Sequence, residues 1–105
     1  MPSSCGSFSS TSSSQLVPPA SAAQVLRYAA VHNADTVAAT VTISVRLSTG
    51  ESVPFVETAV ASGETLELAG AEGLGIPAGA QLVARLDAAP TTTSPSWFAR
   101  WGADG

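Results

Sequence analysis

The sequence predicts an all-β protein: a single antiparallel β-sandwich of about seven short strands, with jelly-roll or immunoglobulin-like topology. Three observations lead to this prediction. The run AATVTISVRLS (38–48) alternates apolar and polar residues with the period of two that a half-buried strand requires. Turn-forming residues recur at intervals of roughly eight to twelve positions, as they do between the strands of a sandwich. No window has a convincing helical period, although AAQVLRYAAV (22–31) could form a helix on propensity alone.

The first two expected strands flank a polar segment. QVLRYAAV (24–31) is apolar and ends at the polar cluster HNADT (32–36), where Asn and Asp favour a turn because their side chains hydrogen-bond the nearby backbone. In the strand expected at 38–48, the odd-numbered residues from Ala39 to Leu47 are apolar and the even-numbered residues are polar. The apolar face should therefore lie in the core.

Glycine and proline bound the later strands. Gly50 gives the turn after the second strand its permissive backbone. Pro54 places the returning strand SVPFVETAV (52–60) at a sheet edge or at a bulge, because proline has no N–H to donate. Pro95 likewise marks an edge or a bend. The remaining strands are expected at residues 65–70, 74–76, 80–89 and 92–101.

Residues 1–23 differ in composition from the rest of the chain. They are dominated by serine, and such a segment buries too little apolar area to offset the entropy cost of ordering it. We therefore divide the chain into an extended arm (1–23), a β-sandwich domain (24–101) and a C-terminal tail (102–105). The arm is either flexible or becomes ordered against neighbouring subunits. In the second case its partner-binding anchors are Phe8, Leu16 and Val17.

The composition favours a protein that is buried in an assembly. Charged residues make up only 11% of the chain, well below the usual quarter, so part of the surface is expected to be covered by something else, although Thr, Ser and Ala could also cover a free surface. The four basic residues are all arginine and the net charge is −4. This leaves no footprint for nucleic-acid phosphates and no basic stretch for a membrane surface. The expected partners are therefore proteins, with no nucleic acid and no membrane.

The N-terminal region also bears on localisation. Cys5 is the only cysteine, so no internal disulfide can form. The first residues have neither the basic nor the apolar region of a secretory signal, and no apolar run approaches the roughly 20 residues needed to cross a bilayer. We expect the protein to be made in the cytoplasm, whatever its later destination.

No constellation of residues predicts an enzyme, a cofactor site or a metal site. His32 and Asp35 lack the setting of a nucleophile elbow and are better explained as part of a turn. The glycines within 70–79 lack the Lys-Ser/Thr pair of a phosphate-binding loop. Glu64 and Glu67 lie three residues apart and therefore point to opposite faces of a strand. One cysteine and one histidine do not form a zinc site.

The aromatic segment near the C-terminus has two interpretations. On an extended strand, Trp97 and Trp101 share one face and Phe98 lies on the other. These residues either close the core or anchor a neighbouring subunit, because Trp and Arg are common hot-spot residues. In the second interpretation the partner-binding residues are Trp97, Phe98, Arg100 and Trp101.

Three segments resemble small all-β virion proteins of tailed bacteriophages. They are VHNADTVAATVTISVRL (31–47), VASGETLEL (60–68) and LGIPAGAQLVARL (74–86), and the similarity covers roughly residues 24–88. In such proteins a polar turn with an Asn precedes an alternating strand, and glycine-containing corners lead into later strands. The resemblance implies a non-enzymatic structural component of a phage particle: a capsid decoration protein, a head–tail joining component, or a tail or fibre subunit.

The resemblance also implies partners and a location. A protein of this kind is made in the host cytoplasm, resides in the virion, and binds copies of itself and other virion proteins such as major capsid or tail components. A homo-oligomer is expected, with a trimer first by analogy, and capsid decoration ranks slightly ahead of the head–tail position. A function of another class is a carbohydrate- or receptor-binding module of a tail fibre or spike, with Trp97 and Trp101 as its stacking platform.

Overall fold

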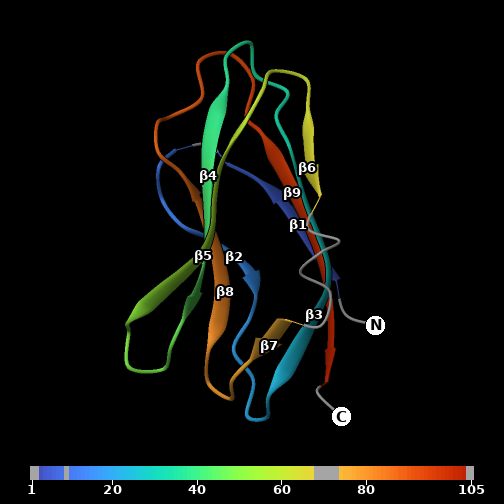
Figure 1. The fold of residues 1–105 in the computed structure, drawn as a ribbon, viewed down its shortest axis with the longest axis vertical. Helices are drawn as coiled ribbons and strands as arrows, with labels where there is room; N and C mark the ends of the chain where they lie inside the picture. The colour runs from blue at the N-terminus through green and yellow to red at the C-terminus, as the bar shows by residue number, and fades with distance from the viewer. Residues whose placement is uncertain (1–2, 9, 68–73, 104–105) are drawn as a thin grey trace.

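The computed structural model of the chain describes residues 3–8, 10–67 and 74–103. These residues form two antiparallel sheets that pack face to face as a sandwich (Figure 1). The prediction of an all-β sandwich is therefore confirmed. The described part of the chain offers no helix that could span a bilayer.

The described residues contain strands at every position that the alternation and turn patterns indicated, and two more in the serine-rich segment. The expected strand at 65–70 is seen as far as residue 67, and its remainder lies outside the described residues. The strands are β1 (Ser3–Ser7), β2 (Ser14–Val17), β3 (Gln24–His32), β4 (Ala39–Arg46), β5 (Ser52–Val60), β6 (Thr65–Glu67), β7 (Leu74–Ile76), β8 (Gln81–Leu86) and β9 (Ser96–Ala103).

The strand order is that of a jelly roll. One sheet has the order β1-β9-β3-β6, with β7 also paired to β3, and the other has the order β2-β8-β4-β5. The first strand thus pairs with the last, β2 with β8, β3 with β6 and β7, and β4 with β5. The chain is one long antiparallel ribbon that is rolled until β9 meets β3 and β8 meets β4. An immunoglobulin-like sandwich orders its sheets differently, so the strand order decides between the two topologies that the sequence left open.

The described part of the serine-rich segment does not form a separate arm, because its two strands belong to the sandwich. β1 pairs with β9 over five consecutive positions and β2 pairs with β8. The three residues proposed as anchors for a neighbouring subunit are at most 1% exposed and lie in the core of their own chain. The backbone hydrogen bonds of β1 and β2 do not depend on which side chains the segment carries. A prediction from composition alone therefore misses them. The anchors in question are Phe8, Leu16 and Val17.

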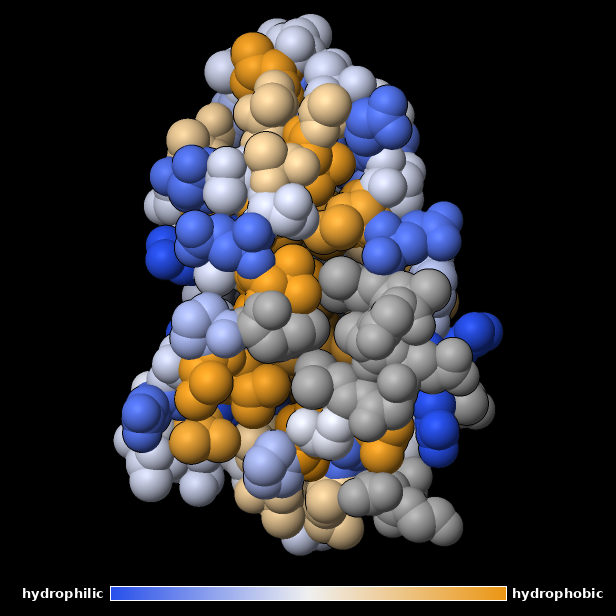
Figure 2. Space-filling model, in the orientation of Figure 1, coloured by the Kyte–Doolittle hydropathy of each residue, from blue (hydrophilic) through white to orange (hydrophobic). Residues whose placement is uncertain are grey.

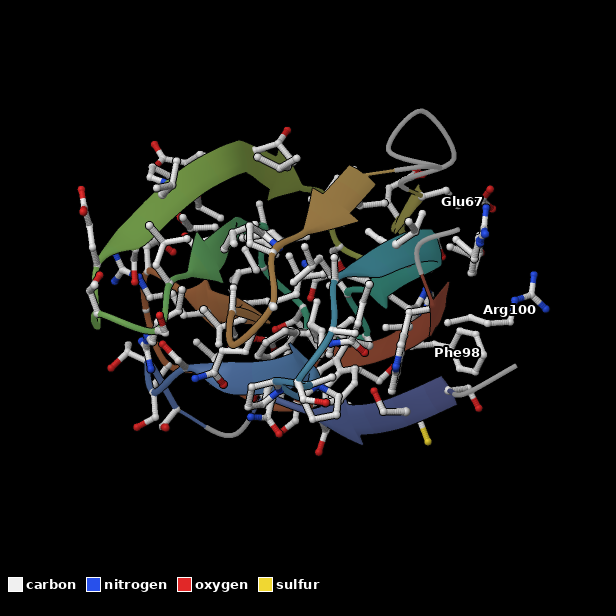
Figure 3. The ribbon with its side chains drawn as sticks, turned by 90° about the horizontal axis from the view of Figure 1, so that it is seen from below. Glu67, Phe98 and Arg100 are labelled. Atoms are coloured by element: carbon white, nitrogen blue, oxygen red, sulfur yellow. The ribbon has the colours of Figure 1, made fainter. Side chains whose placement is uncertain are left out.

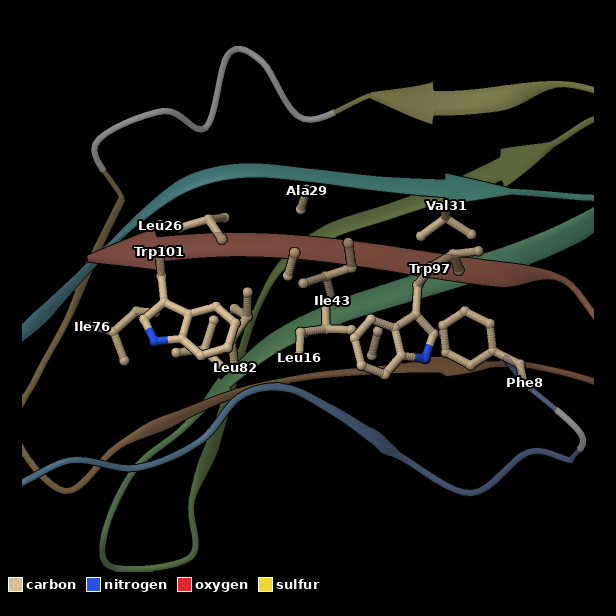
Figure 4. Packing of buried hydrophobic residues seen from close by; sticks show 14 of the residues in the cluster. Phe8, Leu16, Leu26, Ala29, Val31, Ile43, Ile76, Leu82, Trp97 and Trp101 are labelled. Carbon is tan, nitrogen blue, oxygen red and sulfur yellow. The ribbon is translucent and has the colours of Figure 1, made fainter. Parts of the chain in front are cut away.

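The core is built around two indoles from β9. Figure 4 shows Trp97 and Trp101 projecting from this strand to the same side, with Phe8 beside Trp97 and Ile76 beside Trp101. Trp97 is 9% exposed and Trp101 is 7% exposed. The Nε1–H of Trp97 is buried without an acceptor among the described residues, so packing rather than hydrogen bonding holds this ring.

The alternation in β4 is confirmed. Val41 and Ile43 are fully buried, while the polar residues that alternate with them, Thr40, Thr42 and Ser44, are partly exposed on the other face of the sheet. Pro54 lies on an edge strand, beside a register shift between β4 and β5, as its missing N–H predicted. Pro95 directly precedes β9, where its carbonyl accepts a hydrogen bond of 2.8 Å from the backbone N–H of Phe8.

Replacing Gly6 with alanine should destabilise the sandwich. A Cβ atom at Gly6 would lie 2.9 Å from Cζ2 of Trp97, and the indole is held on its other sides by the core. Overpacking of this kind costs about 1–3 kcal/mol. We expect Gly6→Ala to lower the free energy of unfolding by that amount in urea titrations. Gly75→Ala is the matched control, because a Cβ there meets no atom within 4 Å, and it should be nearly neutral.

Removing residues 2–20 should prevent folding. The deletion takes away β1 and β2 together with three buried core residues, so the inner faces of β8 and β9 would be exposed to water. We expect the truncated chain to show no cooperative thermal transition in circular dichroism. A cooperative transition would instead establish residues 24–101 as a self-sufficient domain with a dispensable arm.

Candidate functional site

The outer face of the β1-β9-β3-β6 sheet carries the two predicted partner-binding residues that are exposed, Phe98 and Arg100. Phe98 is 37% exposed, and in Figure 3 both side chains project away from the sandwich on the same side as Glu67. The strand register aligns Cys5, Phe98, Ala30 and Glu67 in one row across four strands. The sequence pattern indicated that Phe98 faces away from the tryptophans, and this is confirmed.

An aromatic ring that was not predicted completes this cluster. Tyr28 of β3 pairs with Arg100 of β9, and the guanidinium carbon of Arg100 lies 5.9 Å from the centre of the Tyr28 ring. The Tyr28 and Phe98 rings are 6.1 Å apart between centroids and tilted by 54°. Both geometries are favourable, the first as a cation–π contact and the second as an aromatic pair. We call Tyr28, Phe98 and Arg100 the aromatic–arginine cluster.

The sequence could predict only part of this cluster. The period of two along β9 places Phe98 on the face opposite the tryptophans, but no sequence pattern indicates that β9 lies next to β3, the strand of Tyr28. A register shift beside Arg27 also interrupts the alternation in β3, so Tyr28 cannot be assigned to a face from spacing alone.

The other predicted partner-binding residues do not reach this surface. Phe8, Leu16, Val17, Trp97 and Trp101 all belong to the hydrophobic core of the described chain. Their apolar area is covered within the chain, which is the core-closure interpretation for the two tryptophans. Neither indole face is available as a stacking platform while the fold is intact.

The side chains of Asn33 and Asp35 hold the polar segment between β3 and β4 in place. The Asn33 amide donates to the carbonyls of Val37 and Val60, each at 2.9 Å, and its oxygen accepts from the Asp35 N–H at 3.0 Å. The Ser62 hydroxyl donates to the Asp35 carbonyl. Asn33 therefore ties the β3–β4 turn to the end of β5.

The Asp35 carboxylate gathers the loop that precedes β9. It accepts hydrogen bonds from the backbone N–H groups of Thr36, Thr91, Thr92 and Thr93 and from two threonine hydroxyls, at 2.8–3.3 Å. The bond from the Thr91 N–H, followed by those from Thr92 and Thr36, holds the pKa of Asp35 well below its ordinary value, although burial acts in the opposite direction. The ionised carboxylate thus holds residues 91–93 in place through their backbone N–H groups.

His32 and Asp35 have separate hydrogen-bond partners in this fold. The Nδ1 atom of His32 lies 2.8 Å from the Thr65 hydroxyl on the outer side of the sheet. Among the hydrogen bonds of the described residues, none joins His32 to Asp35. In the same part of the chain, no three His, Cys, Asp or Glu side chains are grouped as metal ligands would be.

The opposite sheet has a polar hollow on its outer face. It encloses about 220 Å³ and is lined mainly by β4, β5 and β8, with Arg46, Arg85 and Glu57 as its charged residues. The Arg46 Nε–H donates to the Ser52 hydroxyl over a long 3.5 Å. Serine and threonine hydroxyls form much of the remaining wall, so this surface differs in character from the aromatic–arginine cluster.

Apolar surface is also visible between the sheets. Figure 2 shows a band of apolar residues along the middle of the molecule, in the view that places one sheet on either side of it. Val56 of β5 and Leu66 of β6 pack against the core and are only partly buried. Val53, near the start of β5, is 48% exposed.

Neither a protein-family model, nor a curated protein, nor a solved structure matches this chain. The function therefore has to be inferred from the exposed residues and from the composition.

Replacing Asp35 with asparagine should destabilise the protein at neutral pH and remove a pH dependence. The folded pKa of Asp35 is lowered, so the unfolded chain takes up its proton first, and wild-type stability falls as the pH drops below about 4. An amide oxygen carries no charge and its NH₂ group opposes the threonine N–H donors.

We expect a lower urea midpoint for Asp35→Asn at pH 7, and a gap from the wild type that narrows below pH 4. Asp87→Asn removes the same charge from an exposed position and serves as the control. A constant gap between Asp35→Asn and the wild type across this range would contradict the role of the carboxylate charge.

Proposed function

We propose that this chain is a non-enzymatic structural protein of a phage particle, most closely a capsid decoration or head–tail accessory protein that acts through protein–protein contacts. The observation that carries the proposal is the aromatic–arginine cluster, which stands on the outer face of the sheet while both tryptophans are buried. A chain that buries its tryptophans yet leaves Phe98 exposed beside Arg100 presents the residue types that dominate protein interfaces.

The geometry of the aromatic–arginine cluster favours binding of a protein partner, because the three side chains are held in place before a partner arrives. Arg100 lies against the Tyr28 ring, and Tyr28 lies against Phe98, so each side chain restricts the rotamers of the next. All three stand on paired strands rather than on a loop, which fixes their backbone. Less conformational entropy is then lost when a partner covers them.

Charge narrows the class of partner. The net charge of −4 disfavours phosphate-rich surfaces, and lysine is absent from the chain. The low charged fraction agrees with a surface that is covered over much of its area by protein.

The resemblance of residues 24–88 places the proposal in a phage particle. The jelly-roll strand order agrees with it, since viral capsid domains use this architecture, although lectin domains and cupins do too. We propose that the protein is made in the host cytoplasm and resides in the virion. Its partners would be copies of itself and other virion proteins, with a trimer as the oligomer suggested by analogy.

The alternative of a carbohydrate- or receptor-binding module loses its main support. Both tryptophans are at least nine-tenths buried, so their rings cannot stack on a sugar. A module of this kind would have to use Phe98 and Tyr28 in place of the tryptophans, or the polar hollow on the other sheet, where Arg46 and Arg85 stand among hydroxyl groups without an aromatic ring.

Phe98→Ala should weaken binding to the particle without unfolding the protein. Loss of an exposed aromatic anchor from an interface typically costs 2 kcal/mol or more, which corresponds to roughly thirtyfold weaker binding. The measurement is co-sedimentation with phage heads and tails from a host strain in which the neighbouring genes encode such proteins. Val37→Ala, which trims another exposed apolar side chain in the β3–β4 turn, is the control and should bind normally.

Two outcomes would contradict the proposal. One is that the single variants Phe98→Ala and Arg100→Ala both co-sediment with head and tail proteins as well as the wild type does. The other is a coding sequence whose neighbours encode neither capsid nor portal nor tail proteins.

A further inference from the structure

The jelly roll leaves four sheet edges, and three of them are protected. β5 carries Pro54 and a register shift, β2 has a register shift and is followed directly by Pro18, and β6 and β7 are three residues each. Prolines, bulges and short length are the devices by which proteins keep an edge from pairing with another chain.

Within its own five residues β1 has none of these devices, although Pro2 precedes its first residue. Its five residues, SSCGS, contain no charge and no proline, and they pair with β9 in an unbroken register. Four of the five are exposed. An unprotected edge of this kind is a template for a further strand.

The backbone groups that point outward from β1 can be assigned. The Phe8 N–H donates to the Pro95 carbonyl at 2.8 Å, continuing the β1–β9 ladder by one position. Because antiparallel strands alternate, Gly6 and Ser4 also direct their N–H and C=O groups toward β9. Ser3, Cys5 and Ser7 therefore direct theirs toward the open side, where no strand of the described chain pairs with them.

We propose that β1 pairs antiparallel with β1 of a second copy of this chain, about a two-fold axis at Cys5. This deepens the proposed function, on which its biological meaning rests, by naming one self-contact of the assembly. It also replaces the trimer suggested by analogy, because a two-fold contact closes a dimer. The axis aligns Ser3 with the partner's Ser7 and Cys5 with the partner's Cys5. All outward-facing N–H and C=O groups of the strand would then be paired.

The chemistry of β1 fits a copy of itself. A two-fold contact sets each residue against the same strand, so any charge near the axis would face a like charge, and β1 has none. Its serine, glycine and cysteine side chains are small enough to pair without a clash. Arg100 aligns with Ser3 at one end of the strand, so the two Arg100 side chains would lie at opposite ends of the contact.

The pairing also extends the surface that contains the cluster. Cys5 stands next to Phe98 in the register, so the apolar row from Ala30 through Phe98 to Cys5 would continue into the matching row of the second copy. The two β1-β9-β3-β6 sheets would become one continuous sheet, with an aromatic–arginine cluster on each side of the axis.

Sedimentation equilibrium of the full chain tests the proposal. We expect the wild type to approach twice the 10.5 kDa monomer mass as its concentration rises, and Cys5→Lys to remain at the monomer mass, because it sets two like charges on the axis. Cys5→Pro should do the same by removing an outward N–H while leaving the β1–β9 bonds in place. Ala59→Lys adds the same charge to an exposed position on β5 and should leave the dimer unchanged.

A second measurement locates the axis. Residues opposite each other in a hydrogen-bonded antiparallel pair have Cα atoms about 5.5 Å apart, within the range of a disulfide. Diamide, which accepts two electrons and two protons from a pair of thiols, should therefore join wild-type dimers through Cys5. The double variant Cys5→Ser with Ser12→Cys carries an exposed thiol elsewhere and should cross-link far more slowly.

The outcomes separate this inference from the proposed function. A wild type that stays monomeric, or a trimer that Cys5→Lys does not disturb, would overturn the β1 contact whatever the particle assay shows. A dimer lost in Cys5→Lys and retained in Ala59→Lys would establish it, even if the protein never joined a particle. Thermal unfolding of each variant shows whether loss of the dimer is loss of the fold.

Discussion

The pairing of the last strand with the first is the interaction on which the rest of the structure depends. β9 lies between β1 and β3, sends Trp97 and Trp101 into the core, and presents Phe98 and Arg100 on the outer face. One strand therefore supplies both the largest buried side chains and the candidate partner surface. Removing β1 would expose one edge of β9 and, beside Gly6, the flank of the Trp97 indole.

Where the chain turns, buried polar groups rather than apolar contacts define the geometry. Asn33 and Asp35 are almost fully buried, and both are hydrogen-bonded: the Asn33 amide donates to backbone carbonyls, and the Asp35 carboxylate accepts from backbone N–H groups and threonine hydroxyls. The corner thus joins β3, the end of β5 and the loop before β9, and hydrogen-bond donors rather than a cation stabilise the carboxylate charge. Because the polar groups of Asn33 and Asp35 are used to hold the fold together, we look for function on the faces and edges of the sheets.

Much of the fold could be predicted from particular residues, and the errors had one cause. The alternation from Ala39 to Leu47 predicted a strand and Pro54 predicted a sheet edge, because alternation and a missing N–H are properties of the local sequence. Phe8, Leu16 and Val17 were misplaced because their serine-rich surroundings suggested an arm, whereas β8 and β9 provide the pairing that orders them. Tyr28 was missed for the same reason: its neighbour Arg100 is distant in sequence.

The sequence by itself determined the fold class and the faces of the alternating strands, since period and turn chemistry need no knowledge of neighbours. Only the tertiary structure decided that the tryptophans close the core, that the serine-rich segment is part of the sandwich, and that Tyr28 meets Arg100. The strand order β1-β9-β3-β6 belongs with these, and so does the free edge of β1. These features arise from pairings between distant segments, whose hydrogen bonds involve the backbone common to all residues and therefore leave little trace in the side-chain pattern.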